Sequence, residues 1–294
     1  MEGKAALFRE FAGLNSIPLV LETTDVDEIV DVLVKLRSSF GAVNLEDISA
    51  PRCFELEEKL ITALDCPVMH DDQHGTAIVV LAALYGALET LSRQITGLRV
   101  VVYGAGAAGV ACTKMLIAAG VTNILVLDSQ GIISRDRGRL NPIKRQLADS
   151  TNPDNVTGGI AEAMAGADVF LGLSSGTVPS ELLTSMAPEP IIFALSNPDP
   201  EIHPHIARKH AAVVATGRSD FPNQINNVLA FPGVFLGALD SSANRITEQM
   251  KLAAARAIAD VARDELDRDH IVPSVLNPRV VPAVAAAVAA AAQG

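Results

Sequence analysis

The chain has 294 residues, a formal net charge of −11 at pH 7 and 49% hydrophobic residues. This length is sufficient for one large domain or two modest ones, with an ample hydrophobic core. The excess of negative charge argues against nucleic acid and against an anionic membrane surface as partners. Because tryptophan is absent and only two tyrosines are present, we expect the core to be mainly aliphatic.

The cysteines and the apolar stretches indicate the cellular compartment. Cys53, Cys66 and Cys112 are scattered and form no C-x-x-C pair, which is typical of reduced thiols and argues against a structural zinc site. Residues 280–293 are apolar, but the stretch is short and contains a proline near its start, so we interpret it as a packed terminal helix. We therefore expect a soluble, cytoplasmic protein.

The first 95 residues alternate between helical and strand patterns. Residues 25–39 are amphipathic and begin with acids, and residues 51–64 begin with a proline; both features are typical of helices. Short apolar runs, such as residues 41–45, are typical of strands. The predicted elements are helices at residues 1–12, 25–39, 51–64 and 73–91, and strands at residues 18–22, 41–45 and 67–69.

Two of these strands run into acidic residues. Glu46 and Asp47 follow one strand, and Asp71 and Asp72 follow the other. Ligands of open α/β sheets collect beyond the carboxyl ends of strands, and clustered carboxylates repel one another unless a cation lies among them. Such a set of oxygen ligands favours Mg²⁺ or Mn²⁺. The alternative is that these acids are solvated loop residues or, in the case of Asp72, a helix cap.

Other polar residues are ambiguous when they are taken alone. His70 and His74 are four residues apart, but the glutamate of a zinc protease is missing, so buried structural histidines are favoured. Lys4 would ordinarily be a solvated lysine. The loop amides that could bind a substrate carboxylate, or simply form Asx turns, belong to Asn197, Asn226 and Asn227.

Residues 98–128 read LRVVVYGAGAAGVACTKMLIAAGVTNILVLD and carry the strongest local motif. The pattern predicts a strand over 99–103, a glycine turn, a helix to about residue 119 and a second strand over 123–128. The glycines permit a sharp turn, close approach of a pyrophosphate and tight helix–strand packing, and Asp128 is placed to accept a ribose diol. Because all parts occur in order, we predict binding of a nicotinamide or flavin dinucleotide. The residues predicted to hold it are Gly104, Ala105, Gly106, Ala107, Ala108, Gly109 and Asp128.

Further strands are predicted at residues 167–173, 190–195 and 212–216, each followed by a polar loop, and an amphipathic helix at residues 246–267. The predicted fold class is α/β, with a Rossmann-type doubly wound dinucleotide-binding domain and a smaller, incomplete α/β domain for substrate and metal. The predicted divisions are residues 1–95 for substrate and metal, residues 96–245 for the dinucleotide, and residues 246–294 as helices that pack back on the first domain.

Several stretches together resemble one enzyme family. They read MEGKAALFREFAG, GAVNLEDISAPRCFELEEKL, CPVMHDDQHGTAIVVLAAL, FALSNPDPE and PNQINNVLAFPGVFLGAL. They are similar to the small bacterial malic enzymes, which oxidatively decarboxylate L-malate to pyruvate and CO₂ with NAD⁺ or NADP⁺. The resemblance covers essentially the whole chain, and the combination of NLEDI with HDDQHGTA is far more specific than the glycine turn.

The resemblance implies roles for individual residues. Lys4 matches the general base that takes the proton of the malate C2 hydroxyl, and Asp71 matches a residue that orients or tunes that lysine. The divalent metal, Mg²⁺ or Mn²⁺, would be held by Glu46, Asp47 and Asp72. Asn197 and Asn227 match asparagines that contact the cofactor and the malate carboxylate. The resemblance also implies a homodimer.

This sequence departs from the family at its start. The tyrosine that protonates enolpyruvate lies in a Y-[ST]-P-G-V-like motif, which is missing here; the tyrosines present are Tyr85 and Tyr103. The chain therefore resembles an N-terminally shortened copy, in which we expect turnover to be weak or absent. The alternatives are a non-catalytic nucleotide- and metal-binding remnant or partner of a full-length homologue, and a metal-independent NAD dehydrogenase. Asp128 favours NAD over NADP, although Arg135, Arg137 and Arg139 lie close in sequence.

Overall fold

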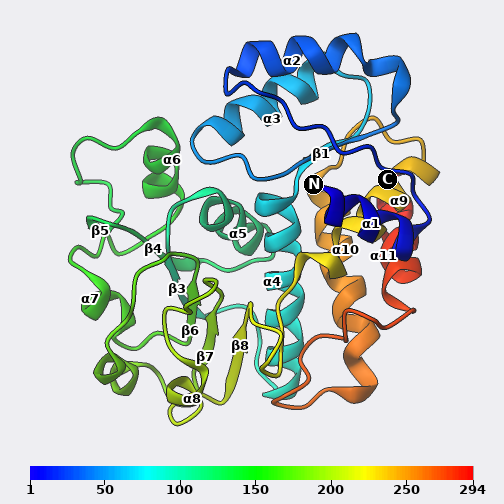
Figure 1. Ribbon diagram of the computed structural model, residues 1–294. Helices are drawn as coiled ribbons and strands as arrows, with labels where there is room; N and C mark the ends of the chain where they lie inside the picture. The colour runs from blue at the N-terminus through cyan, green and yellow to red at the C-terminus, as the bar shows by residue number, and fades with distance from the viewer. Residues whose placement is uncertain (294) are drawn as a thin grey trace. The chain divides into compact units, whose positions relative to one another are not determined.

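The computed structural model describes residues 1–293, which form an α/β protein (Figure 1). The chain folds as two compact units. Unit 1 contains residues 1–82 and 226–261 and the chain from Pro273 on, and unit 2 contains residues 83–225 and 262–272. Within the described residues, no helix combines the length and the apolar character needed to cross a membrane.

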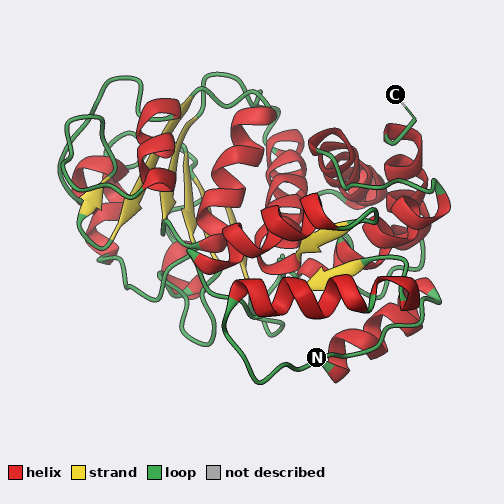
Figure 2. Ribbon diagram, turned by 90° about the horizontal axis from the view of Figure 1, so that it is seen from above, coloured by secondary structure: helices red, strands yellow, loops and turns green. Residues whose placement is uncertain are grey.

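Unit 2 is built on a six-stranded sheet in the order β5-β4-β3-β6-β7-β8, seen with its strands in yellow in Figure 2. All neighbouring pairs are parallel except β4 and β5. The chain winds outward from β3 through β4 and then returns to β6 on the other side of β3, so the strand order reverses between β3 and β6. The strands are β3 (Arg99–Tyr103), β4 (Asn123–Asp128), β5 (Gly131–Ile132), β6 (Val169–Gly172), β7 (Ile191–Ala194) and β8 (Val213–Thr216).

This topology confirms the predicted fold class and the strands expected in this part of the chain. Strands β6, β7 and β8 are buried along their whole length, as expected for parallel strands covered on both faces. Their core includes Phe170 and Ile192, both completely buried. The helices of unit 2 are α5 (Ala107–Ala118), α6 (Pro142–Ser150), α7 (Ile160–Met164), η2 (Ser180–Ser185), α8 (Pro204–Ala207) and η4 (Arg263–Glu265).

Unit 1 contains a short parallel sheet of β1 (Val43–Leu45) and β2 (Val68–His70), in a register that pairs Leu45 with His70. The helices α2 (Val26–Lys35) and α3 (Arg52–Ala63) pack on each other and share a core with these strands. Helix α4 (Asp71–Thr90) begins directly after β2, and the chain passes from unit 1 to unit 2 within it.

The remaining helices of unit 1 are α1 (Glu2–Ala12), η3 (Asn227–Leu229), α9 (Phe231–Asp240), α10 (Glu248–Ala262) and α11 (Val280–Ala291), with η1 (Arg37–Ser39) following α2. Phe8 anchors α1 on α9 through edge-to-face contacts with Phe231, at 4.8 Å between ring centroids, and with Phe235, at 5.4 Å. Helix α11 packs on α9 so tightly that a Cβ on Gly233 would lie 2.6 Å from Val284 Cβ. The Phe8 contacts thus hold α1 against α9.

The structure corrects several local predictions. The expected strand at residues 18–22 is irregular chain, in which Ile17 and Val20 are 73% and 82% exposed. Its apolar pattern is typical of a strand, but in the described residues no neighbouring strand supplies the ladder hydrogen bonds that a strand needs. Helix α10 ends at Ala262, short of the predicted residue 267. Strand β5 and helix α6 lie in a stretch for which the sequence predicted no element; α6 is capped by the Asn141 side chain.

Candidate active site

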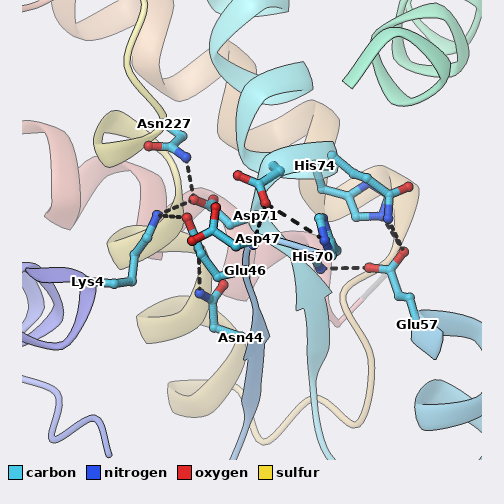
Figure 3. A network of polar contacts seen from close by, with 11 residues as sticks. Lys4, Asn44, Glu46, Asp47, Glu57, His70, Asp71, His74 and Asn227 are labelled. Atoms are coloured by element: carbon cyan, nitrogen blue, oxygen red, sulfur yellow. Dashed lines mark hydrogen bonds and ion pairs between the residues drawn. The ribbon is translucent and has the colours of Figure 1, made fainter. Parts of the chain in front are cut away.

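The parallel register of β1 and β2 brings two sets of acids together in unit 1 (Figure 3). Glu46 follows Leu45, and Asp71 follows His70, its register partner, so both acids leave the same edge of the small sheet. Asp71 and Asp72 also form the first turn of α4, where the helix dipole stabilises negative charge. The two strand ends that carry the acids are therefore neighbours in the structure.

Lys4 lies between the two acids although it is far from them in sequence. Its Nζ donates a hydrogen bond to Asp71 Oδ2 at 2.6 Å and forms an ion pair with Glu46 Oε1 at 2.9 Å (Figure 3). The same Nζ lies 4.2 Å from the centroid of the Phe231 ring, a cation–π contact. With 13% of its side chain exposed, Lys4 is a partly buried, paired lysine, unlike the solvated lysine that its position alone would suggest.

Asp71 is the most buried acid of the cluster, with none of its side chain exposed. Its Oδ2 also accepts a hydrogen bond from Asn227 Nδ2 at 2.5 Å, whereas its Oδ1 has no hydrogen-bond partner in the described residues. A Cβ on Gly75 would lie 1.8 Å from that Oδ1, so glycine is required there. Burial raises the pKa of Asp71 to about 7, even though Lys4 opposes the change.

The pKa values of the neighbouring groups are shifted because the cluster contains more carboxylates than ammonium groups. Burial raises the pKa of Glu46, and the Asp72 charge adds to this effect, although the bond to Lys4 opposes it. Burial alone would lower the pKa of Lys4, but the two acids outweigh burial and raise it. Both members of the Lys4–Asp71 pair thus have a raised pKa. For Asp71 the cause is complete burial, and for Lys4 it is the presence of two acids beside one ammonium.

The backbone of Asp47 contacts the side chain of Asp72. Asp47 is held at φ 57°, in the left-handed region, and its N–H donates to Asp72 Oδ2 at 2.8 Å. Asn44 donates from Nδ2 to Glu46 Oε2 at 3.1 Å. In residues 1–293 no three side chains of His, Cys, Asp or Glu are arranged as a metal site, so the predicted ligands Glu46, Asp47 and Asp72 are not gathered around one point. Their chemistry fits a divalent cation, since oxygen donors and surplus negative charge are both present.

Glu57 is a buried acid of this region that the sequence reasoning missed. Its Oε1 accepts the His70 backbone N–H at 2.8 Å, and its Oε2 lies 2.9 Å from His74 Nε2. His74 Nδ1 lies in turn 3.1 Å from Lys251 Nζ. Burial opposes ionisation of Glu57, but the His74 interactions and the His70 N–H together lower its pKa. The signal was present in α3, where Glu57 shares a helical face with the buried Cys53 and Leu60.

The glycine turn between β3 and α5 lies in unit 2 and has the expected tight geometry. Gly104 has φ 127°, and a Cβ on it would lie 2.5 Å from the Leu173 carbonyl oxygen. A Cβ on Gly109 would lie 1.8 Å from the Gly104 oxygen, so both positions require glycine. Gly106 caps α5 without a side chain, and the space around it is open. The first N–H groups of α5 are therefore accessible to an anion.

Asp128 ends β4 and is engaged by two cations. Its Oδ2 accepts from Arg137 Nη2 and from Lys144 Nζ, each at 2.6 Å, and its Oδ1 accepts the Gln130 N–H at 2.9 Å. Burial opposes ionisation, but these bonds outweigh it and lower the pKa of Asp128 to about 2. Of the arginines that the sequence placed near Asp128, the structure pairs Arg137 with it. Lys144, on α6, was not anticipated.

The predicted asparagines fall in different units. Asn197 is an exposed residue in the loop that follows β7, in unit 2. Asn227 begins η3 in unit 1 and contacts Asp71. Asn226 caps the same short helix, with its Oδ1 accepting the Val228 N–H at 3.0 Å, so the Asx-turn alternative applies to Asn226. Unit 1 therefore gathers Lys4, Glu46, Asp71 and Asn227, and unit 2 carries the glycine turn, Asp128 and Asn197.

Comparison with known proteins identifies the family. Residues 1–61 match the malic enzyme N-terminal domain and residues 73–293 match the malic enzyme NAD-binding domain. The chain is 53% identical to the NAD-dependent malic enzyme of Geobacillus stearothermophilus, with 99% of this chain and 62% of the relative aligned. It is 51% identical to the bifunctional malic/malolactic enzyme of Bacillus subtilis, with 99% and 72% aligned.

Solved structures agree with this result. The malic enzyme from Pyrococcus horikoshii superposes with a TM-score of 0.95 at 42% identity, covering 100% of this chain and 70% of that one. The NAD-dependent malic enzyme from Thermotoga maritima gives 0.94 at 42% identity, covering 98% and 77%. The chain thus spans only part of each relative, about three fifths in the case of the Geobacillus protein. Sequence, fold and family models agree: the chain belongs to the malic enzyme family.

Proposed function

We propose that the chain carries out the oxidative decarboxylation of L-malate to pyruvate and CO₂, with reduction of NAD or NADP. The observation that carries the proposal is the partly buried Lys4 paired with Asp71 and Glu46, in a chain of this family. The Geobacillus relative is NAD-dependent and a Halomonas elongata relative, 44% identical, is NADP-dependent. Both cofactors are therefore candidates.

In this proposal Lys4 takes the proton of the malate C2 hydroxyl as hydride leaves C2 for the nicotinamide. A lysine acts as a base only when it is neutral, whereas Asp71 and Glu46 raise the pKa of Lys4 in the ligand-free chain. Positive charge that binds the acids would remove this effect and lower the pKa of Lys4. Asp71 and Asn227 then act by orientation, since both bonds converge on Asp71 Oδ2 and fix the direction of the ammonium.

The acids that surround Lys4 are proposed to hold the divalent cation. Glu46, Asp47 and Asp72 would bind Mg²⁺ or Mn²⁺, which when bound supplies Lewis acidity at the C2 oxygen of malate. The raised pKa of Glu46 and the surplus of carboxylates over ammonium groups support this assignment. The Asp47 side chain is solvent-exposed, and its left-handed backbone places its N–H on Asp72.

The dinucleotide is proposed to bind at the carboxyl ends of β3 and β6, where the strand order reverses. Its pyrophosphate would meet the turn of Gly104, Gly106 and Gly109, and Asn197 would contact the cofactor or the substrate carboxylate. Asp128 would face the ribose. Arg137 and Lys144 offset the charge of Asp128, which makes a 2′-phosphate more acceptable than Asp128 alone would suggest.

Turnover by these 294 residues alone is proposed to be weak. Enolpyruvate must be protonated at carbon, and the tyrosine motif that the family uses for this step is missing from the sequence. The proposal also includes a homodimer, which would cover the exposed Ile17 and Val20, and a cytoplasmic location, which the free, buried cysteines support.

The test is reduction of NAD⁺ and NADP⁺ with L-malate and Mn²⁺, with and without a chelator, with pyruvate assayed in the same samples. Metal-dependent reduction with matching pyruvate would support the proposal. Reduction that survives the chelator would favour a metal-independent dehydrogenase. No reduction by a chain that still binds nucleotide would favour the alternative of a non-catalytic nucleotide- and metal-binding protein.

A further inference from the structure

Unit 2 contains a buried acid that the proposed chemistry does not use. Glu201 lies in the loop between β7 and α8 and is 2% exposed. Its carboxylate forms no ion pair in residues 1–293 and accepts hydrogen bonds from backbone N–H groups. The Ser174 N–H donates to Oε1 at 2.8 Å, and the Ser196 N–H donates to Oε2 at 3.3 Å. Burying a carboxylate without a cationic partner costs desolvation free energy, which here only main-chain hydrogen bonds offset. Such a carboxylate is expected where the fold needs those main-chain groups held in place.

The donors belong to two separate loops. Ser174 lies in the loop after β6, and Ser196 lies in the loop after β7, next to Asn197. The backbone repeats the link, since the Glu201 carbonyl accepts the Val178 N–H at 2.9 Å. One side chain therefore bridges the carboxyl ends of two neighbouring parallel strands.

The bridge extends to the glycine turn. A Cβ on Gly104 would lie 2.5 Å from Leu173 O and 3.2 Å from Ser174 Cβ, so the loop after β6 packs directly against that turn. Glu201 fixes this loop through Ser174, and the loop in turn supports the first glycine of the motif. Three adjacent strands, β3, β6 and β7, thus have their carboxyl ends linked through Glu201.

We infer that Glu201 is a positioning residue of the dinucleotide site, which holds the loops after β6 and β7 against the glycine turn. The inference rests on the proposed function, because it takes this edge of the sheet as the cofactor site. Glutamate suits the role because each carboxylate oxygen accepts from a different loop. An amide would offer one acceptor and would direct its own N–H₂ at a backbone donor.

Gly172, the last residue of β6, provides a second way to test the inference. A Cβ on Gly172 would lie 2.5 Å from Glu201 Cδ, so alanine there would displace the carboxylate without removing it. Asp168 offers a matched control at the other end of β6. It also accepts a backbone N–H, from Arg99 at 2.8 Å, and it pairs with Arg93. Asp168 precedes β6, so its substitution leaves the carboxyl ends of the strands intact.

The experiment measures the Kd of NADH and NADPH by nicotinamide fluorescence, together with the unfolding midpoint, for the full chain and for E201Q, G172A and D168N. We expect E201Q and G172A to weaken binding of the preferred nucleotide about tenfold or more, equivalent to about 1.4 kcal/mol, with Kd measured where each variant is folded. D168N should lose stability and keep its Kd within about twofold, as an independent structural site does.

Three results would overturn the inference. The first is an unchanged Kd in either E201Q or G172A. The second is an equal loss of affinity in D168N, which would show that the effect is general destabilisation. The third is failure of both E201Q and G172A to fold, which would make Glu201 a residue of stability alone. If the unaltered chain binds neither nucleotide, the proposed function itself fails, and the inference fails with it.

Discussion

Replacing Asp71 by asparagine should remove a pH dependence from the stability of this chain. Asp71 is completely buried, and burial raises the pKa of its carboxyl from the ordinary 3.8 to about 7, against the opposing pull of Lys4. The folded state therefore keeps this proton when the unfolded state has already lost it, so stability falls as pH rises between about 4 and about 7. A pKa rise of that size corresponds to a loss of about 4 kcal/mol in the free energy of unfolding.

The assay is urea unfolding at several values between about pH 4 and about pH 8, with the free energy of unfolding compared between D71N and the unaltered chain. Relative to the unaltered chain, the free energy of unfolding of D71N should rise by up to about 4 kcal/mol across this pH range. Lys4 does not interfere, since stability from a raised lysine pKa is lost only above the ordinary value of 10.5. D128N is the control: the pKa of Asp128 is about 2, so its contribution is lost only below about pH 4. Parallel profiles for D71N and the unaltered chain would refute the reasoning.

Three further substitutions test the remaining parts of the account. K4M should reduce malate oxidation by about 10² or more and leave NADH affinity unchanged, because the base is lost and the glycine turn is not touched; equal activity would exclude Lys4 as the base. E57Q should cost about 1–3 kcal/mol in urea unfolding and weaken Mn²⁺ binding, because an amide turned toward His74 disturbs the turn between β2 and α4; unchanged Mn²⁺ affinity would limit Glu57 to stability. K144A should weaken NADPH binding more than NADH binding, because it removes a cation 2.6 Å from Asp128; an equal effect on both would exclude Lys144 from cofactor choice.

The parts of this molecule that follow from local pattern could be predicted from the sequence. The strand, glycine turn, helix and strand of residues 98–128 carry their own signals in periodicity and glycine spacing, and the structure confirms each element. The acids after β1 and β2 could be placed at strand ends, because short apolar runs define where those strands stop. That the two strand ends are neighbours came from the structure, which pairs β1 with β2.

What the sequence could not predict depends on contacts between distant residues. Lys4 meets Asp71 because Phe8 anchors α1 on α9, and no spacing in the sequence encodes that packing. Lys144 reaches Asp128 from α6, a helix that was not predicted because its sequence is polar. Residues 18–22 have a strand pattern but no neighbouring strand among residues 1–293, and a pattern read from one segment does not reveal its partner. Glu201 gave no signal either, since its partners are backbone groups of two loops.

The central claim is that the chain oxidises and decarboxylates L-malate, and product analysis tests it most directly. The measurement is NMR of ¹³C-labelled L-malate incubated with the 294-residue chain, Mn²⁺ and either oxidised nucleotide, with reduced nicotinamide quantified in the same tube. We expect labelled pyruvate and CO₂ in amounts equal to the reduced nicotinamide, formed slowly by the unaltered chain and about 10²-fold or more slower by K4M. Labelled oxaloacetate as the end product, or no conversion by a chain that still binds NADH, would contradict it.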